Sequence, residues 1–386
     1  MASSSSEQVR PATPLSAGDQ EDWRDWANLD EGLTKRMAEH ALANDVADYL
    51  CFRAVCAPWR DSTEDPQPQN VLHPRFHPRR WILLPGPGRI GAADNLRQMR
   101  NLSSGERIAV NLPDLHGHAV AAGSGGSPGG VLVLVDERSL HVRLLNPLTA
   151  QFIDFPSVAP VFSRRRVGRI DKSFQDISRV TGAGIAGDST VVLHFGFDNK
   201  LASAKLGDNS WVVISEGNLL CSAFPFASNV YFANKEGLMV VDADAAPAPR
   251  LVLVASWPSS DWTMVHMADS SSGELLVLID KVHFKHGDDY LVEHRVFRLD
   301  KAAGMLVPTM DLGERALFVG DFSGALCVSS KDFRCIIPNT IYFQHDRFNR
   351  FYVRRISDGK TRLLFGAANG SLFDDLTSYV AWNART

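Results

Sequence analysis

From Trp81 to the end of the chain, short runs of β-branched and aromatic residues follow one another with almost no helical periodicity between them. About 22 strand candidates can be counted, separated by Gly, Pro, Asn or Asp turns. Only residues 92–100 have the pattern of a short helix. An α/β fold needs helices that this region lacks, and a sandwich would need fewer strands.

A strand, a polar turn and a second strand recur along this region, which indicates a repeated structural unit. The turns fall near Asn146, Asp208, Asp300 and Asp358, and one more hairpin around Asp242 fits between the second and the third. The mean step of roughly fifty residues is close to the length of one four-stranded propeller blade. The sequence therefore predicts a mainly β fold.

The predicted architecture is a β-propeller of about six four-stranded blades, with seven as the alternative, over residues 73–386. A propeller avoids exposed strand edges by closing its ring of blades. We expect residues 81–84, near its start, and residues 378–382, near its end, to supply the closing strands.

The N-terminal part has a different character. Residues 1–20 are rich in Ser, Pro and Ala and are expected to be disordered, whereas residues 23–62 have helical patterns. Leu33, Met37 and Ala41 recur at four-residue spacing, which predicts one apolar helix face.

A second helix is expected to start near Val46, because Asn44 and Asp45 are favourable N-cap residues. Its apolar stripe consists of Phe52, Val55, Cys56 and Trp59. Pro58 cannot lie inside a helix, so this helix should stop near Cys56 and restart as a short turn at Trp59.

Helices this small cannot bury their apolar faces alone, so they need a partner or the neighbouring domain. The polar residues 63–72, which contain proline, are expected to be a linker between the two parts.

Composition narrows the class of protein. The formal net charge of −4 gives no general attraction to nucleic acid or to anionic lipid. Five cysteines without a C-x-x-C pair argue against a disulfide framework and for a reducing compartment. With no signal-peptide core and no run of about 20 apolar residues, the chain is expected in the cytoplasm, the nucleus or both.

The segment that starts at Asp25 resembles the F-box of a large group of plant F-box proteins, in which a DW-x-x-L start precedes DYL-x-FRAVC-x-x-WR. The resemblance continues in RFHPRRWILLP, in HVRLLNPLTAQFIDFP, in the GDNSW turn and in ALFVG…PNTIYF. These pieces are similar to the KIB-type β-propeller domain that follows the F-box in that group. The resemblance covers the chain from about Asp25 to Phe343 in the expected order.

The resemblance implies a three-helix F-box that docks on a Skp-type adaptor, which links the chain to a cullin-based ubiquitin ligase. The propeller is then expected to recruit a protein substrate, whose identity the sequence does not reveal. Such a subunit is not an enzyme, and we expect no catalytic, cofactor or metal site and no nucleic-acid or membrane partner. The implied adaptor-binding residues are Leu29, Leu33, Met37, Leu50, Phe52, Val55, Cys56, Trp59 and Arg60.

The F-box departs from the usual pattern of the family. The family usually has Pro where this chain has Asp30, Leu where it has Thr34 and Arg where it has Cys51, and Gly32 weakens the first helical turn. These departures predict weaker adaptor binding than in relatives with the usual residues. A second interpretation stays open, in which the F-box is vestigial and the propeller is an interaction scaffold outside the ligase.

Two glycine motifs resemble catalytic or cofactor motifs, but their prolines argue against function. Residues 86–91 fit G-x-G-x-x-G, yet Pro85 and Pro87 remove backbone donors that a dinucleotide site would need. Residues 125–129 fit the nucleophile elbow G-x-S-x-G, yet Pro128 lacks the N–H that the oxyanion hole requires. Both are predicted to be turns or loops between strands.

Other candidate side chains carry a weaker signal. The histidines lack the spacing of known metal sites, the arginine cluster is interpreted as a solvated loop and the tryptophans as propeller core. These residues are His116, His118, His283 and His286 with Asp288 and Asp289, then Arg164, Arg165, Arg166 and Arg169, then Trp211, Trp257 and Trp262.

Overall fold

The computed structural model divides the chain into two compact units, one comprising Met1–Asn44 and Asp48–Glu64 and the other Asp45–Ala47 and Asp65–Thr386. The structure describes residues 25–67, 71–84, 95–121, 130–162, 180–258, 264–284, 290–320, 325–344, 351–364 and 375–376, apart from the single residues 188, 197, 218, 222 and 271. The disorder predicted for residues 1–20 lies outside the described residues.

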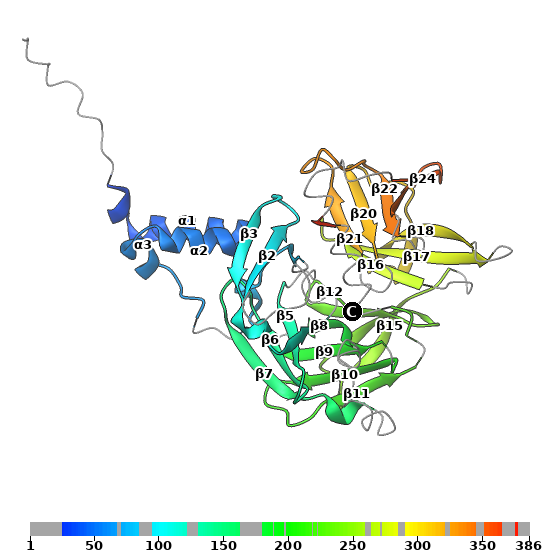
Figure 1. Ribbon diagram of the computed structural model, residues 1–386, viewed down its shortest axis with the longest axis horizontal. Helices are drawn as coiled ribbons and strands as arrows, with labels where there is room; N and C mark the ends of the chain where they lie inside the picture. Colours follow the sequence, from blue (N-terminus) through cyan, green and yellow to red (C-terminus); the bar gives the residue numbers. More distant parts are fainter. Residues whose placement is uncertain are drawn as a thin grey trace, which may run out of the picture. The chain divides into compact units, whose positions relative to one another are not determined.

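Three α-helices and a short 3-10 helix lie near the N-terminus (Figure 1): η1 (Trp26–Asn28), α1 (Glu31–Asn44), α2 (Val46–Ala54) and α3 (Ala57–Asp61). The carboxylate of Asp30 caps α1, because its Oδ1 accepts a hydrogen bond from the Leu33 amide at 3.1 Å. The predicted interruption near Cys56 is confirmed, because α2 ends at Ala54. The next helix begins at Ala57 rather than at Trp59, since proline is tolerated in the first turn of a helix and Pro58 lies in the first turn of α3.

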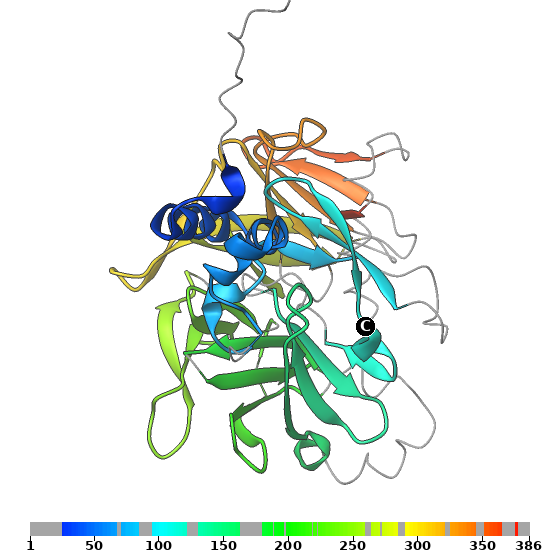
Figure 2. The same cartoon turned by 90° about the vertical axis from the view of Figure 1, so that its left-hand side faces the viewer.

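Among the described residues, the larger unit is built from six sheets that follow one another along the chain, and the first five of them are antiparallel throughout (Figures 1 and 2). The predicted six-bladed propeller is therefore confirmed. The strands are β1–β3 (Trp81–Leu83, Leu96–Asn101, Arg107–Asn111), β4–β7 (His118–Val120, Leu132–Asp136, His141–Leu145, Phe152–Ser157), β8–β11 (Val180–Ala186, Thr190–Phe195, Lys200–Lys205, Val212–Glu216), β12–β15 (Phe224–Phe226, Asn229–Ala233, Gly237–Asp242, Arg250–Ser256), β16–β19 (Met264–Asp269, Leu275–Phe284, Tyr290–Asp300, Met305–Pro308) and β20–β24 (Arg315–Val319, Leu326–Ser329, Thr340–Gln344, Phe351–Arg355, Thr361–Leu363).

Each recurring hairpin predicted from the sequence is formed by the last two strands of one blade, and this holds for five blades. Asn146 lies between β6 and β7, and Asp208 lies between β10 and β11. The other three turns join β14 to β15, β18 to β19, and β23 to β24. In the turn after β18, Oδ1 of Asp300 accepts a hydrogen bond from the Ala303 amide at 2.9 Å.

Two blades differ from the four-stranded plan. The first sheet has three strands among the described residues, and the last has five, in the order β21-β20-β22-β23-β24. In the last sheet β20 and β22 run parallel to each other, because the β20–β21 hairpin is inserted at one edge.

The prediction of a short helix at residues 92–100 is wrong for residues 96–100, which belong to a strand. Leu96–Asn101 forms β2, which pairs with β1 on one side and with β3 on the other. The two flanking strands form hydrogen bonds with the backbone of β2, and Met99 is completely buried. This tertiary pairing outweighs the local helical preference of the segment.

Six hydrophobic clusters each join two neighbouring sheets and so connect the blades into a ring. One of them joins the last sheet to the first, because Phe318 and Tyr342 pack in the same cluster as Ile82 and Leu102. The closing strand expected at residues 378–382 lies outside the described residues, but the ring is closed by this packing.

Polar contacts cross the same junction between the last sheet and the first. Arg80 donates a hydrogen bond from Nη2 to the carbonyl of Cys327 at 2.9 Å. Arg100 donates from Nε to Oδ2 of Asp375 at 2.8 Å, and both side chains are largely buried. A residue close to the C-terminus is thus fixed against the first sheet.

The segment predicted to be a linker is largely part of the propeller unit. Residues 65–67 and 71–72 are described, and Val71 and Leu72 are buried in the core cluster of the second and third sheets. Gln67 donates from Nε2 to the carbonyl of Thr149, and Gln151 hydrogen-bonds the carbonyl of Pro66. The continuous segment of the propeller unit therefore begins at Asp65, and the same unit also includes Asp45–Ala47.

Candidate functional site

Helix α1 has one buried face and one partly exposed apolar face. Thr34, Ala38 and Leu42 are buried, and the Thr34 hydroxyl donates to the carbonyl of Asp30 at 3.0 Å. On the adjacent face Leu33 is 40% exposed and Met37 is half-buried. The apolar side chains of Leu33 and Met37 are therefore not fully buried within the helical unit.

The turn between α2 and α3 carries a second apolar group. Phe52 stacks on Trp59 with ring centroids 4.5 Å apart, and the Trp59 indole donates to the carbonyl of Trp26 at 2.8 Å. Val55 is 62% exposed and Trp26 is 55% exposed. Neighbouring large apolar side chains that are exposed to solvent, such as these two, are typical of a surface that a partner covers.

Arg53 holds this turn in place. Its Nη1 donates to the carbonyls of Arg60, Thr63 and Glu64 at 2.8 to 3.0 Å, so the chain after α3 is tied back to α2. Tyr49 adds a hydrogen bond from its hydroxyl to the same Glu64 carbonyl at 2.7 Å. The buried guanidinium has a positioning role, because it fixes the loop that follows Trp59.

The structure places the nine implied adaptor-binding residues in one small helical unit, and none of them is fully buried. Half-buried are Leu29, Met37, Leu50, Phe52, Cys56 and Trp59, whereas Leu33, Val55 and Arg60 are exposed. The sequence interpretation missed Trp26 and Arg53, although Trp26 is the second residue of the DW start.

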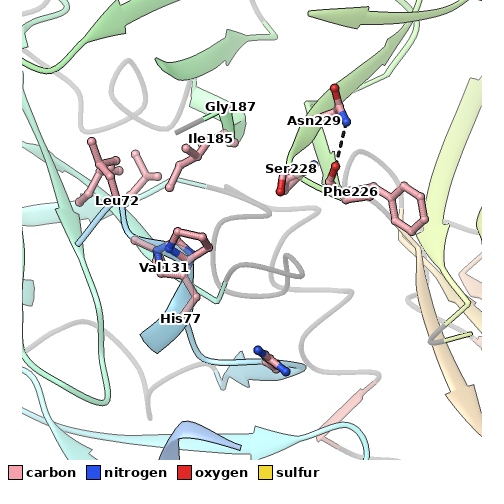
Figure 3. Close-up of a pocket in the computed structure, with 16 residues that line it drawn as sticks. Leu72, His77, Val131, Ile185, Gly187, Phe226, Ser228 and Asn229 are labelled. Atoms are coloured by element: carbon pink, nitrogen blue, oxygen red, sulfur yellow. Dashed lines mark hydrogen bonds between the residues drawn. The ribbon is translucent and has the colours of Figure 1, made fainter. Parts of the chain in front are cut away.

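In the propeller, a pocket of about 250 Å³ lies where the second, third and fourth sheets meet residues 72–79. Figure 3 shows Leu72, His77 and Val131 on one side of it and Ser228 and Asn229 on the other. No sequence motif selected this pocket, because its lining comes from segments far apart in the chain. The lining residues are Leu72, Pro74, His77, Arg79, Val131, Val133, Leu144, Ala183, Gly184, Ile185, Gly187, Pro225, Phe226, Ala227, Ser228 and Asn229.

A buried cluster of three polar side chains, Asp280, His266 and His294, lies in the fifth sheet. Asp280 is within 2.6 Å of Nδ1 of His294 and 3.4 Å of Nε2 of His266, on three neighbouring strands. Burial raises the pKa of Asp280, but the two histidines outweigh burial and hold it well below its usual range. The group is enclosed between blades, with His294 against the ring of Phe343, so we assign it to the core rather than to catalysis.

A profile of the KIB1-4 beta-propeller family matches residues 99–366, which is more than half of the chain. The chain belongs to the KIB1-4 beta-propeller family. The match begins within β2, the second strand of the first sheet, and ends soon after β24, so it covers five blades of this KIB1-4 propeller and part of the first, and it does not include the helical unit. Membership supports a role in protein interaction.

Solved structures resemble the KIB1-4 propeller only distantly. The nidogen/laminin complex has 11% identity and a TM-score of 0.35, covering 75% of this chain and 94% of that chain. The β-propeller domain of Cps50 (Swd1) from Myceliophteria thermophila has 12% identity and a TM-score of 0.33, covering 74% and 89%. A functionally unknown protein from Desulfotomaculum acetoxidans DSM 771 has 12% identity and a TM-score of 0.35, covering 75% and 86%. The search of curated proteins found no match.

The remaining candidate side chains of the KIB1-4 chain fall into two groups. Trp211 and Trp257 pack in or against core clusters and donate to the carbonyls of Pro156 and Asn234. His116 and His118 are on the surface, and the described residues include no group of three or more His, Cys, Asp or Glu that could hold a metal ion. Outside the described residues lie 86–91, 125–129, Arg164, Arg165, Arg166, Arg169, Trp262, His286, Asp288 and Asp289, as does the side chain of His283.

The five cysteines, all within the described part of the chain, are free thiols. Burial raises the pKa of Cys221 to about 12 and that of Cys327 to about 11, so neither is a reactive thiolate at neutral pH. Among the described helices, none has the length and apolar character needed to cross a membrane.

Proposed function

We propose that this chain is the substrate-recognition subunit of a Skp–cullin–F-box ubiquitin ligase. In this proposal the helical unit docks on a Skp-type adaptor and the propeller recruits a protein substrate. The chain then contributes no catalytic residue, and it acts in the cytoplasm, the nucleus or both.

The observation that carries the proposal is the exposed apolar surface of the helical unit. Leu33, Val55 and Trp26 expose 40, 62 and 55% of their surface. A unit this small has few apolar side chains with which to form a core, so exposing three large ones lowers its own stability. Interfaces of this kind bury a few aromatic and aliphatic anchors and surround them with polar residues. Along the chain, a helical unit with exposed apolar residues is followed by a propeller. An adaptor-linked substrate receptor needs these two parts, one to bind the adaptor and one to bind the substrate.

Co-purification with a Skp-type adaptor tests the proposal. The substitution Leu33→Asp puts a carboxylate on the exposed stripe and should lower adaptor affinity at least tenfold, because a charge would be buried without a partner. Val55→Asp should act in the same direction. The matched control is Lys35→Asp on the opposite side of α1, where 57% of the side chain is exposed, and it should bind as the wild type does.

The scaffold interpretation makes the opposite prediction. If the full-length wild type does not bind a Skp-type adaptor under conditions in which it is folded, the ligase proposal is wrong and the chain is a propeller scaffold. Binding that Leu33→Asp and Lys35→Asp weaken equally would mean that the adaptor does not use the predicted stripe.

A further inference from the structure

A second pocket, the last-sheet pocket, lies at the hairpin that ends with β24 (Figure 1) and has a volume of about 360 Å³. Its charged lining residues are the cations Arg355, Lys360 and Arg362 and the carboxylate of Asp358. The remaining lining residues are uncharged: Thr340, Val353 and Thr361. The lining therefore has two net positive charges, although the whole chain has a formal net charge of −4.

The pairing of β23 with β24 brings the three cations to one face of the sheet. Val353 and Arg355 are alternate residues of β23, so their side chains lie on the same face. Arg362 is opposite Val353 in the register and shares that face. Lys360 closes the hairpin opposite Arg355, whose amide donates to the Lys360 carbonyl at 3.0 Å. The positive charge of the pocket thus follows from the fold of one hairpin.

The cations keep hydrogen-bond donors for an occupant. Within the described part of the chain, the exposed side chain of Arg362 makes no ion pair and no hydrogen bond. Nη1 of Arg355 and Nζ of Lys360 lie 3.6 and 3.8 Å from Oδ2 of Asp358, beyond the range of about 2.7 to 3.2 Å of an N–H···O hydrogen bond. Oδ1 of Asp358 accepts the Lys360 amide at 3.0 Å, so this carboxylate is part of the turn.

The charge of the lining selects among anionic occupants. A carboxylate would neutralise one of the two net positive charges, whereas a phosphorylated side chain carries a charge of about −1.5 to −2 at pH 7 and has three acceptor oxygens. The planar guanidinium group donates to phosphate oxygens in pairs. The two arginines and the lysine of the pocket therefore match a phosphate better than a carboxylate.

The charge of the chain favours a protein as the source of the phosphate. Proteins that bind nucleic acid neutralise a run of phosphates, and segments that bind anionic membranes carry clusters of Lys and Arg. This chain has a net charge of −4, and the pocket balances one of its three cations with Asp358. A single phosphorylated residue fits these charges.

We propose that the last-sheet pocket binds a phosphorylated serine or threonine side chain of the protein substrate. The phosphate accepts hydrogen bonds from the guanidinium groups of Arg355 and Arg362 and from the ammonium group of Lys360. Recruitment by the propeller then depends on earlier phosphorylation of the substrate. The inference rests on the proposed function, since it names the class of segment that the propeller would recruit.

Three peptides test the pocket on the full-length chain by isothermal titration calorimetry. They are acetylated, amidated heptapeptides of Ala and Gly that differ only in the central residue, which is phosphoserine, Glu or Ser. We expect saturable binding of the phosphoserine peptide. The Glu peptide should bind about fivefold more weakly, because a carboxylate has less charge and fewer acceptor oxygens, and the Ser peptide should show no binding.

Substitutions of the cations locate the binding. Arg362→Gln should weaken the phosphoserine peptide about tenfold, as expected for loss of one charge-assisted contact, and Arg355→Gln should act in the same direction. The matched control is Arg334→Gln, which removes an exposed arginine of the same unit outside the pocket and should leave binding unchanged.

The substitution Asp358→Asn should increase the affinity. It keeps an oxygen that can accept the Lys360 amide and removes the negative charge beside the phosphate, so the phosphoserine peptide should bind about threefold more tightly. Unfolding of a variant cannot produce this result. Weaker binding by Asp358→Asn would overturn the proposal, as would equal binding by the wild type, Arg355→Gln and Arg362→Gln.

Other phosphate compounds test the class of occupant. Inorganic phosphate, a decauridylate and phosphatidylcholine vesicles that contain phosphatidic acid are titrated in the same way. Each should bind more weakly than the phosphoserine peptide. Tighter binding of any of them that Arg362→Gln removes would overturn the proposal, because the site would then take a free ion, a nucleic acid or a membrane.

Adaptor co-purification separates this inference from the proposed function. Arg362→Gln should bind a Skp-type adaptor as the wild type does, since Arg362 is in the other unit. A wild type that binds the adaptor but not the phosphoserine peptide rejects the pocket alone. Binding of the phosphoserine peptide without adaptor binding rejects the ligase role and leaves the pocket in place.

Discussion

Strand β9 of the propeller is buried at all six of its positions, whereas helix α1 buries three of its 14 residues. The strand has a neighbouring sheet on each face, so both of its faces become core, and four of its six residues are apolar. The helix buries one narrow face and leaves Leu33 in water. The propeller thus completes its own core, and the helical unit does not.

This difference indicates which unit depends on another molecule. A ring of blades removes free faces because each blade covers the next, and the last covers the first through the cluster around Phe318. A few short helices cannot do this, so their exposed apolar residues mark the surface where a partner adds to the core. The predictions below test this contrast, from the largest expected effect to the smallest.

The largest effect is expected where the ring closes. Asp375→Ala leaves the Arg100 guanidinium, which is largely buried, without the carboxylate at 2.8 Å, and should lower the free energy of unfolding by about 3–5 kcal/mol. Urea unfolding followed by circular dichroism measures the loss. Asp242→Ala, which removes the exposed pair with Arg250, is the control and should cost less than about 1 kcal/mol. Equal losses would mean that closure does not depend on Asp375.

Acid should weaken the propeller through His194. Burial lowers the pKa of this histidine to about 4, below the value of about 6.5 expected in the unfolded chain. As the pH falls from 6.5 to 4 the unfolded state binds the proton first, so stability that is present above pH 6.5 is lost. Between pH 7 and pH 5 the loss from this group should be about 2 kcal/mol.

The substitution His194→Leu tests this loss, because it removes the group that titrates. The drop in unfolding free energy between pH 7 and pH 5 should shrink in this variant. His141→Leu changes an exposed histidine of another blade and should leave the drop as in the wild type. An unchanged drop in His194→Leu would assign the acid sensitivity to other groups.

A smaller and local effect is expected in the helical unit. Asp30→Ala removes the N-cap of α1 and should cost about 1 kcal/mol of local helix stability. Hydrogen exchange should speed up for amides of α1 but not for those of β9, because the propeller does not depend on this cap. Asp61→Ala, at the end of α3, is the control for loss of a surface carboxylate. Faster exchange in both units would contradict their independence.

The structure also changes how the unusual residues of the helical unit are interpreted. Asp30 is in the N-cap position and its side chain accepts the Leu33 amide, so proline there would remove a cap rather than favour the first turn. Thr34 is buried, whereas its neighbour Leu33 is exposed. Thr34 therefore acts on the helical core, and Leu33 is the better probe of adaptor binding.

The sequence was sufficient for the features that depend on local pattern. Polar turns such as those at Asn146 and Asp300 recur because every outer hairpin needs one, and the break before Pro58 follows from the missing backbone donor. Strand β2 was mistaken for a helix because its partners, β1 and β3, decide its conformation.

The pocket and the closing contacts could not be predicted, since they join distant segments. Leu72, Ile185 and Ser228 meet only after three sheets have assembled, and Arg100 is 275 residues from Asp375. No local pattern carries that information. Leu33 and Val55 were identified from the sequence, but their exposure follows only from the structure.

The most direct test of the contrast is to express residues 25–64 and residues 65–386 separately and to record circular dichroism spectra of each. We predict that residues 65–386 give a β-rich spectrum and a cooperative melting transition. This transition should lie below that of the full chain, because these residues lack Asp45, whose carboxylate accepts the hydrogen bond of the buried Trp81 indole. Residues 25–64 alone should be weakly helical and should gain helix when a purified Skp-type adaptor is added. A helical unit that is fully folded alone and does not respond to the adaptor would contradict the account, as would a propeller that fails to fold without it.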